Sequence, residues 1–130
     1  MKVLANDGLA KSGIAALGLN GFEVDLTTVA QDQLVDYINK NLIDVLLVRS
    51  ATKVRKDIID NCPSLKIIGR GGVGMDNIDV EYAREKGLKV INTPAASSHS
   101  VAELVFAHLF GMVRFLHDSN RNMPLEGDVK

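Results

Sequence analysis

Residues 66–91 read KIIGRGGVGMDNIDVEYAREKGLKVI, which is a short apolar run, a glycine-rich loop, a helical stretch and a second apolar run. Gly87 follows the helical stretch, as glycine often does at the C-terminus of a helix. A parallel strand can begin only after the chain has crossed back over the sheet, usually as a helix. The order strand, loop, helix, strand therefore indicates two neighbouring parallel strands.

The same alternation extends back to the N-terminus, where apolar residues at helical spacing separate further apolar runs. The expected strands are residues 2–5, 22–26, 43–48, 66–69 and 88–91. Short connections between them favour right-handed crossovers, with helices on both faces of the sheet. We therefore predict an α/β fold with a flavodoxin-like, doubly wound parallel sheet of five strands in the order 2-1-3-4-5.

The composition is that of an ordinary globular protein of 130 residues, with 46% hydrophobic and 24% charged residues. The net charge of -1 gives no reason to expect a nucleic acid or a membrane surface as a partner. Cys62 is the single cysteine, which excludes an intrachain disulfide and argues against a zinc site built from thiolates. The apolar run at the N-terminus is too short for a signal peptide, so we expect a cytoplasmic protein.

The last helix differs from the others. Ser100 and Glu103 have the spacing of a capping box, which predicts that the helix starts at Val101. Apolar side chains then occupy every face through residue 116, although Glu103, His108 and Arg114 interrupt the run, which is shorter than a membrane span. A helix that is apolar all round must be covered all round, so we expect a second domain or another copy of the chain to cover it.

The segment from Gly69 to Gly74 matches the dinucleotide-binding pattern G-x-G-x-x-G, but its context does not. In that fingerprint the third glycine lies in the first turn of a helix, and the next strand ends in an acidic residue. Here we expect the helix to start at Asp79 or Val80, and the next strand ends at Asn92. We therefore predict that this loop does not cradle a pyrophosphate.

The loop has another possible role, because successive glycines let backbone amides converge on a carboxylate. Arg70 adds a charge to this loop, and Arg49 and Ser50 follow the neighbouring strand at the same edge of the sheet. Two arginines and a hydroxyl favour a phosphate or a similar anion. The alternative is a tight turn with solvated arginines in weak ion pairs. We expect Thr52 to cap the next helix.

The remaining candidate groups are weaker. His99, His108 and His117 have no recognisable carboxylate partner in the sequence, and we predict no catalytic role for them and no metal site. Cys62 precedes a proline at a helix end and reads as a small buried hydrophobe. Residues 92–98 are rich in small and hydroxyl side chains, which fits a hinge and a ligand-contact loop equally well.

Four segments together resemble the D-isomer-specific 2-hydroxyacid dehydrogenases, and among these the D-3-phosphoglycerate dehydrogenases. They are VRSAT at 48–52, LKIIGRGGVGMDNID at 65–79, VINTP at 90–94 and SVAEL at 100–104. Their order and spacing match over essentially the whole chain. Arginine at both Arg49 and Arg70 is more similar to the phosphoglycerate branch than to the glyoxylate or hydroxypyruvate reductases.

The resemblance implies reversible hydride transfer between NAD and C2 of 3-phosphoglycerate, the first step of serine synthesis. It implies that Arg49, Ser50 and Arg70 bind the phosphate end of the substrate. It also implies that the amides of Gly71, Gly72, Val73 and Gly74 bind the carboxylate, and that Val73, Ser97 and Val101 approach the cofactor. Valine at 73 and serine at 97 depart from the family, where threonine and asparagine are common.

The resemblance also implies a division of the chain. Residues 1–98 would be a substrate-binding domain, residues 99–117 an interface helix and residues 118–130 a connector towards an NAD-binding domain that is not in the chain. The family's catalytic residues would lie beyond residue 130, so the resemblance implies that the chain alone is inactive and holds NAD weakly. We expect a homo-oligomer, a dimer, with self-association through residues 101–116.

Two alternatives remain open. Within the family, the enzyme could be a glyoxylate or hydroxypyruvate reductase, acting on another small anionic hydroxyacid or ketoacid. Outside it, the chain could be a free-standing flavodoxin-like binding domain. A phospho-receiver is disfavoured, because it needs an aspartate after the third strand and a lysine after the fifth, where this chain has Arg49 and Asn92.

Overall fold

The computed structural model describes residues 1–126. It divides the chain into two compact units, the first comprising Met1–Pro94 and the second beginning at Ala95. The division falls within the loop after the last strand, four residues before the predicted boundary at residue 98.

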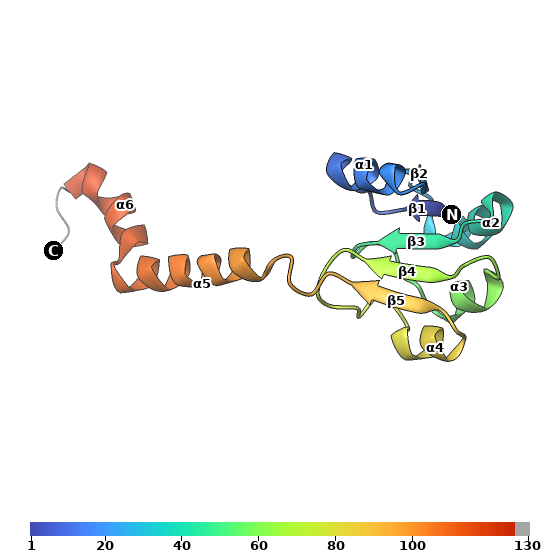
Figure 1. Cartoon of the computed structure of the whole chain (residues 1–130). Helices are drawn as coiled ribbons and strands as arrows, with labels where there is room; N and C mark the ends of the chain where they lie inside the picture. Colours follow the sequence, from blue (N-terminus) through green and yellow to red (C-terminus); the bar gives the residue numbers. More distant parts are fainter. Residues whose placement is uncertain (127–130) are drawn as a thin grey trace. The chain divides into compact units, whose positions relative to one another are not determined.

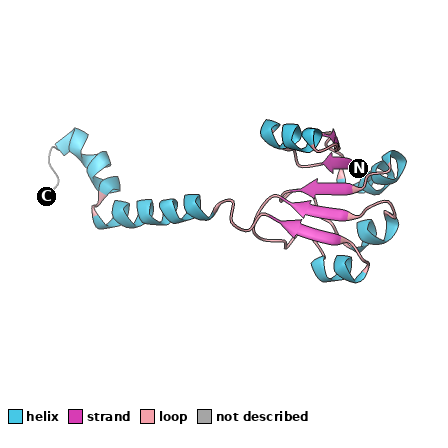
Figure 2. Cartoon of the chain, viewed as in Figure 1, coloured by secondary structure: helices cyan, strands magenta, loops and turns pink. Residues whose placement is uncertain are grey.

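A five-stranded sheet forms the centre of the first unit (Figures 1 and 2). Its strands are β1 (Lys2–Ala5), β2 (Glu23–Asp25), β3 (Val45–Val48), β4 (Ile67–Arg70) and β5 (Lys89–Asn92). All neighbouring strands are parallel, and their order is β2-β1-β3-β4-β5. The predicted fold class and strand order are therefore confirmed.

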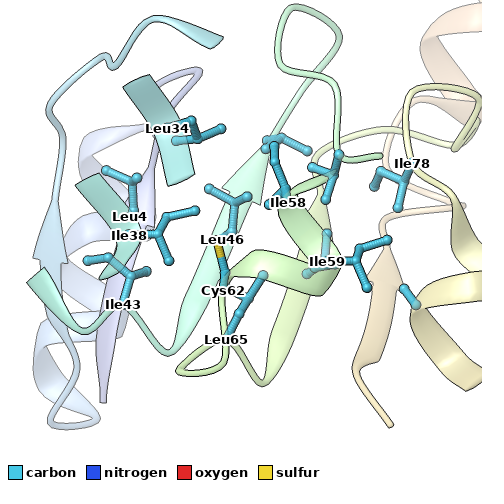
Figure 3. Packing of buried hydrophobic residues seen from close by; sticks show 14 of the residues in the cluster. Leu4, Leu34, Ile38, Ile43, Leu46, Ile58, Ile59, Cys62, Leu65 and Ile78 are labelled. Atoms are coloured by element: carbon cyan, nitrogen blue, oxygen red, sulfur yellow. The ribbon is translucent and has the colours of Figure 1, made fainter. Parts of the chain in front are cut away.

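Three helices pack on one face of this sheet: α2 (Leu34–Asn41), α3 (Lys56–Asn61) and α4 (Val80–Glu85). The hydrophobic core lies between them and the strands, and it consists mainly of leucine, isoleucine and valine (Figure 3). Side chains alternate between the faces of a strand. Leu46 and Val48 of β3 therefore enter the core, while Leu47 lies on the opposite face.

The opposite face is only partly covered within the first unit. Helix α1 (Lys11–Leu19) begins there, because Leu9 and Ala10 line the same cavity as Leu47 and Ile91. Ile91 remains 44% exposed, and no residue of α1 is buried. A short 3-10 helix, η1 (Gln31–Gln33), leads into α2.

The helix ends agree with the signals in the sequence. Helix α4 begins at Val80 after the N-cap residue Asp79. Gly21 and Gly87 follow helices with φ of 76° and 84°, a conformation that glycine adopts without strain. Helix α3 ends before Cys62, which is buried, and burial raises the pKa of its thiol to about 11. The interpretation of Cys62 as a small buried hydrophobe is confirmed.

The second unit consists of α5 (Ser98–Val113) and α6 (Leu116–Glu126), separated at Phe115 by a left-handed φ of 52°. The predicted capping box is wrong: Ser97 is the N-cap residue, no side chain caps the helix, and Ser100 lies inside the first turn. A turn in which the Ser98 amide donates to the Ala95 carbonyl starts the helix before Ser100 can cap it.

The predicted connector, residues 118–130, is helical up to Glu126, and its last four residues lie outside the described part. No single helix among residues 1–126 is long and apolar enough to cross a membrane. The pair α5 and α6, bent by 51°, meets these criteria of length and composition jointly.

The core predicts a contrast between two leucines. Leu46 is fully buried in β3, whereas Leu19 at the end of α1 is 89% exposed. We expect Leu46→Ala to lower the free energy of unfolding by about 2–5 kcal/mol, because it removes buried methyl groups and leaves a cavity. The control Leu19→Ala should change it by less than about 0.5 kcal/mol. Urea unfolding followed by circular dichroism measures both, and equal effects would contradict the packing described here.

Candidate functional site

A cavity of about 620 Å³ opens at the carboxyl ends of the strands. The segments that follow β1, β3, β4 and β5 contribute to its lining, as expected for parallel strands that end at one edge. Its lining residues are Asp7, Gly8, Leu9, Ala10, Leu47, Val48, Arg49, Gly69, Arg70, Gly71, Ile91, Asn92 and Thr93. The structure thus brings together Arg49, Arg70 and the start of the glycine loop, which the sequence proposed as one site.

Gly69 keeps the middle of this cavity open. It lies in β4 between Leu47 of β3 and Ile91 of β5. A Cβ atom at this position would lie 2.7 Å from Cδ2 of Leu47, which is closer than such atoms approach. A larger residue would therefore displace Leu47 and fill part of the cavity.

Arg49 directly follows β3 and is exposed. Within residues 1–126 its guanidinium takes part in no hydrogen bond or ion pair. It lies beside the glycine loop, since a Cβ on Gly71 would be 3.6 Å from Cγ of Arg49. Ser50 is exposed next to it. Arg49 therefore presents an uncompensated positive charge at the cavity.

Arg70 is placed differently. Its Nε donates to the carbonyl of Arg49 at 3.3 Å, and Nη1 donates to the carbonyl of Gly74. Nη2 lies 4.0 Å from a carboxylate oxygen of Asp76, and the side chain is only 14% exposed. In this arrangement the guanidinium stabilises its own loop, because two of its five N–H donors bind backbone carbonyls of the segments on either side.

The amides of the glycine loop are not equivalent. Gly71 donates to the carbonyl of Val48 at 2.9 Å, and Gly72 donates to that of Arg70 at 3.0 Å. In the described part of the chain, the amides of Val73 and Gly74 have no acceptor. The carbonyl of Val73 is held from outside the loop by Nδ2 of Asn92 at 2.7 Å. An incoming carboxylate could therefore take two of the four amides that the sequence suggested.

This geometry also agrees with the rejection of a dinucleotide fingerprint. Helix α4 begins at Val80, so Gly74 is not in its first turn. The amides that would face a pyrophosphate at Gly71 and Gly72 are bonded to the backbone. The described residues of this loop therefore do not fit NAD phosphates.

A largely buried polar network lies next to the site, and no local sequence pattern points to most of its members. Asp7 accepts hydrogen bonds from the amides of Arg49 and Thr52 at 2.6 and 3.1 Å, and from the Thr52 hydroxyl at 2.5 Å. Asn6 donates to Thr52 Oγ1 at 2.8 Å and to the Val29 carbonyl at 3.2 Å. Asn77 donates to the carbonyls of Arg49 and Thr52 at 2.8 and 2.7 Å. The position of Asn6 and Asp7 after β1 was a signal that they lie at this edge.

Thr52 is therefore not a helix cap, and that prediction is wrong. The chain stays extended after it, with Val54 pairing as a bridge with Ile78, and α3 begins at Lys56 after the N-cap residue Arg55. Thr52 is buried, and its hydroxyl needs a partner at once, which Asp7 supplies.

Burial alone would raise the pKa of Asp7, but hydrogen bonds more than offset it. The Thr52 hydroxyl and the amides of Arg49, Thr52 and Ala51 stabilise the ionised form, so the pKa of the Asp7 carboxyl lies below its usual range. Asp7 is therefore ionised near neutral pH, and its charge is directed at backbone amides.

The remaining residues that the sequence singled out, Ser97, Val101 and the three histidines, lie in the second unit. Ser97 precedes α5, and Val101 lies in its exposed first turns. His108 and His117 line a separate hollow of about 420 Å³ between α5 and α6, while His99 is exposed and does not line it. Among residues 1–126 no cluster of three or more histidine, cysteine or acidic residues has a geometry that could hold a metal ion.

The family model for the catalytic domain of D-isomer specific 2-hydroxyacid dehydrogenases matches residues 3–123. Hydroxypyruvate reductase of Thermotoga maritima is 46% identical over 117 residues, which are 88% of this chain and 37% of that protein. D-3-phosphoglycerate dehydrogenase of Methanocaldococcus jannaschii is 46% identical over 115 residues, which are 88% of this chain and 21% of that protein. The chain thus spans well under half the length of either relative.

Solved structures of 2-hydroxyacid dehydrogenases are similar in fold to this chain. A cofactor-bound 3-phosphoglycerate dehydrogenase of Entamoeba histolytica has a TM-score of 0.68 at 28% identity, covering 85% of this chain and 38% of that one. D-lactate dehydrogenase of Aquifex aeolicus, complexed with NAD and lactic acid, has a TM-score of 0.67 at 22% identity, covering 99% and 39%. The second likeness supports the fold alone.

The different surroundings of the two arginines predict unequal effects on stability. Arg70→Ala leaves the carbonyl of Gly74 without its side-chain donor and the carbonyl of Arg49 with Asn77 alone, so we expect the free energy of unfolding to fall by about 1–3 kcal/mol. Arg49→Ala removes a side chain that has no partner in the described part of the chain and should cost less than about 0.5 kcal/mol. Urea unfolding of the two variants compares them directly. A larger loss for Arg49→Ala than for Arg70→Ala would show that the two roles have been assigned the wrong way round.

Proposed function

The chain belongs to the D-isomer specific 2-hydroxyacid dehydrogenase family, and on that premise we propose that it binds the substrate in an NAD-dependent enzyme that converts 3-phosphoglycerate to 3-phosphohydroxypyruvate. The carrying observation is the Arg49 guanidinium, which has no partner among the described residues and lies beside a loop with two open amides. A phosphoglycerate carries two anionic ends, and these two features offer one binding group to each.

In this proposal Arg49 and Ser50 bind the phosphate, and the amides of Val73 and Gly74 bind the carboxylate. Arg70 keeps the loop in shape and contributes positive charge to the phosphate end. Gly71 and Gly72 let the chain turn sharply enough for the two open amides to follow. Residues 1–98 act as the substrate-binding domain, and residues 99–117 link it to the rest of the enzyme.

We also propose that NAD is the cofactor of the whole enzyme, where it accepts the hydride from C2 of the hydroxyacid. Of the described residues, Val73, Ser97 and Val101 would lie on the cofactor's side. None of them supplies a phosphate cradle or a group able to take the proton from the hydroxyl. The chain by itself should therefore bind substrate weakly and be inactive.

A second candidate is a hydroxypyruvate reductase, which the 46% identity to the Thermotoga maritima protein favours. Its substrate has the same carboxylate end but no phosphate. The carboxylate site at Val73 and Gly74 would then be unchanged, and Arg49 would have no phosphate to bind. Whether Arg49 contributes to substrate binding therefore distinguishes a phosphoglycerate dehydrogenase from a hydroxypyruvate reductase.

The first test is binding of 3-phosphoglycerate and D-glycerate to the chain, followed by NMR amide shifts. We expect the phosphoester to bind at least about tenfold more tightly, since a hydrogen-bonded charge pair contributes about 1.5–3 kcal/mol. Both ligands should shift the amides of Val73 and Gly74. Arg49→Ala should remove the preference, while Arg84→Ala, an exposed arginine on α4, should preserve it. Equal binding of both ligands to the wild-type chain, with tighter binding of hydroxypyruvate, would support the reductase instead.

We further propose that the chain self-associates through residues 101–116. In the unit that α5 and α6 form, the large apolar side chains of α5 are about half exposed or more: Val101, Leu104, Val105, Phe106, Leu109, Phe110, Met112 and Val113. A continuous apolar surface of this kind is unusual on a monomer.

Light scattering at micromolar concentration tests self-association. We expect a dimer or larger species, and Phe106→Glu with Phe110→Glu should shift it to a monomer, because burying a carboxylate at the contact is costly. Leu125→Glu, at an exposed position on α6, should leave the association intact. A wild-type monomer in which NMR shows α5 to be helical would rule out this contact.

A further inference from the structure

We infer that Asp7 is a positioning residue for Arg49: its carboxylate fixes the backbone that presents the Arg49 guanidinium to the ligand. We call the hydrogen bonds that Asp7 accepts from the segment 49–52 the Asp7 clamp. The identity of the ligand rests on the proposed function, but the existence of the clamp does not. Asp7 follows β1, whereas Arg49 follows β3, so the interaction joins two neighbouring strand ends across 42 residues of sequence.

The Asp7 carboxylate binds the backbone amides of the segment 49–52. One oxygen of Asp7 accepts from the amides of Arg49 and Thr52, which lie at the two ends of the segment 49–52. The other oxygen accepts from the Thr52 hydroxyl. Hydrogen bonds to an ionised acceptor are about twice as strong as neutral ones, so this single side chain closes the loop at both ends.

Asn77 and Arg70 bind the backbone carbonyls of the same segment. Nδ2 of Asn77 donates to the carbonyls of Arg49 and Thr52, the residues whose amides Asp7 accepts. Nε of Arg70 adds a bond to the Arg49 carbonyl. Oδ1 of Asn77 is buried without a partner among the described residues, so its amide orientation is set by these two donations alone.

The backbone of Arg49 is thus fixed by hydrogen bonds, whereas its guanidinium has no partner among residues 1–126. Both the amide and the carbonyl of Arg49 are bonded, which fixes the direction in which its Cα–Cβ bond points. Meanwhile Asp7 makes no ion pair with the Arg49 guanidinium. The acid therefore orients the arginine without neutralising it, and the charge stays available to an anion in the cavity.

The test compares Asp7→Asn with Asp25→Asn in the full chain. Asparagine at 7 would present an NH₂ group in place of an oxygen to the amides or to the hydroxyl, so the clamp loses acceptors and its charge. Asp25 is a matched control, because it lies at the carboxyl end of a strand, as the last residue of β2, and accepts from one loop amide, that of Thr27, and one hydroxyl, that of Tyr37. Both variants should lose some stability.

Hydrogen exchange gives the ligand-independent readout. We expect Asp7→Asn to speed exchange of the Arg49 and Thr52 amides by about tenfold, the factor for a hydrogen bond to a charged group. Asp25→Asn should leave these two amides unchanged. Unchanged exchange at Arg49 and Thr52 in Asp7→Asn would overturn the clamp, whatever the ligand proves to be.

Ligand preference gives the second readout, which a purely stabilising residue would not alter. In Asp7→Asn the preference for 3-phosphoglycerate over D-glycerate should fall by about tenfold, as the charge-assisted bond from Arg49 is lost. It should persist in Asp25→Asn. Faster exchange with an unchanged preference would mean that Asp7 holds the loop without positioning Arg49, which overturns the inference.

Failure of the proposed function looks different. If the wild-type chain shows no preference for the phosphoester, the substrate proposal fails, and exchange in Asp7→Asn alone decides whether the clamp exists.

Thr52→Ser and Thr52→Val provide an independent check of the clamp through the Thr52 hydroxyl. Serine keeps the donor to Asp7 and should retain the preference, whereas valine removes it and should reduce the preference in the direction of Asp7→Asn. Equal preference in the two Thr52 variants would argue against the clamp.

Discussion

Parallel pairing of the five strands is the constraint on which the site depends. Because every strand runs in the same direction, the four segments that follow β1, β3, β4 and β5 meet at one edge of the sheet. Each contributes one kind of group: a carboxylate at Asp7, a guanidinium at Arg49 and amides after Gly72 that have no partner among residues 1–126, and a side-chain amide at Asn92. Helices α2, α3 and α4 stabilise this edge indirectly, since their core keeps the strands in register.

The site has two layers with different tasks. Asn6, Asp7, Thr52 and Asn77 lie below and bond almost entirely to backbone or to one another. By contrast, the Arg49 guanidinium and the amides of Val73 and Gly74 have no hydrogen-bond partner among residues 1–126, and Arg49 also lines the cavity. The lower layer explains how a loop without helix or strand structure can hold an arginine in place.

The sequence predicted the fold well, and it predicted that Arg49, Arg70 and Gly71 lie at one edge of the sheet, because both follow from local periodicity and from where strands end. It predicted less about individual side chains. Thr52 is not the helix cap that the sequence predicted. Arg70 braces its own loop, whereas the Arg49 guanidinium has no partner among residues 1–126, a difference that the sequence does not reveal. The deciding partners are distant in the chain: Asp7 reaches Thr52 across 45 residues, and Asn77 reaches Arg49 across 28. Such pairings depend on tertiary structure, and no local pattern encodes them. The capping box failed for the opposite reason, since a turn at Ala95–Ser98 started the helix early.

The division of labour at Arg49 also has an evolutionary consequence. The fold depends on the peptide groups of residue 49, which any amino acid other than proline provides, and not on its side chain. Substitutions there should therefore be nearly neutral for folding and, under the proposed function, should change which anion is held. Arg70 has no such freedom, because its guanidinium bonds the loop together. On the proposed role of Arg49, residue 49 is thus a position at which a lineage could exchange one hydroxyacid for another without first acquiring a compensating, stabilising mutation.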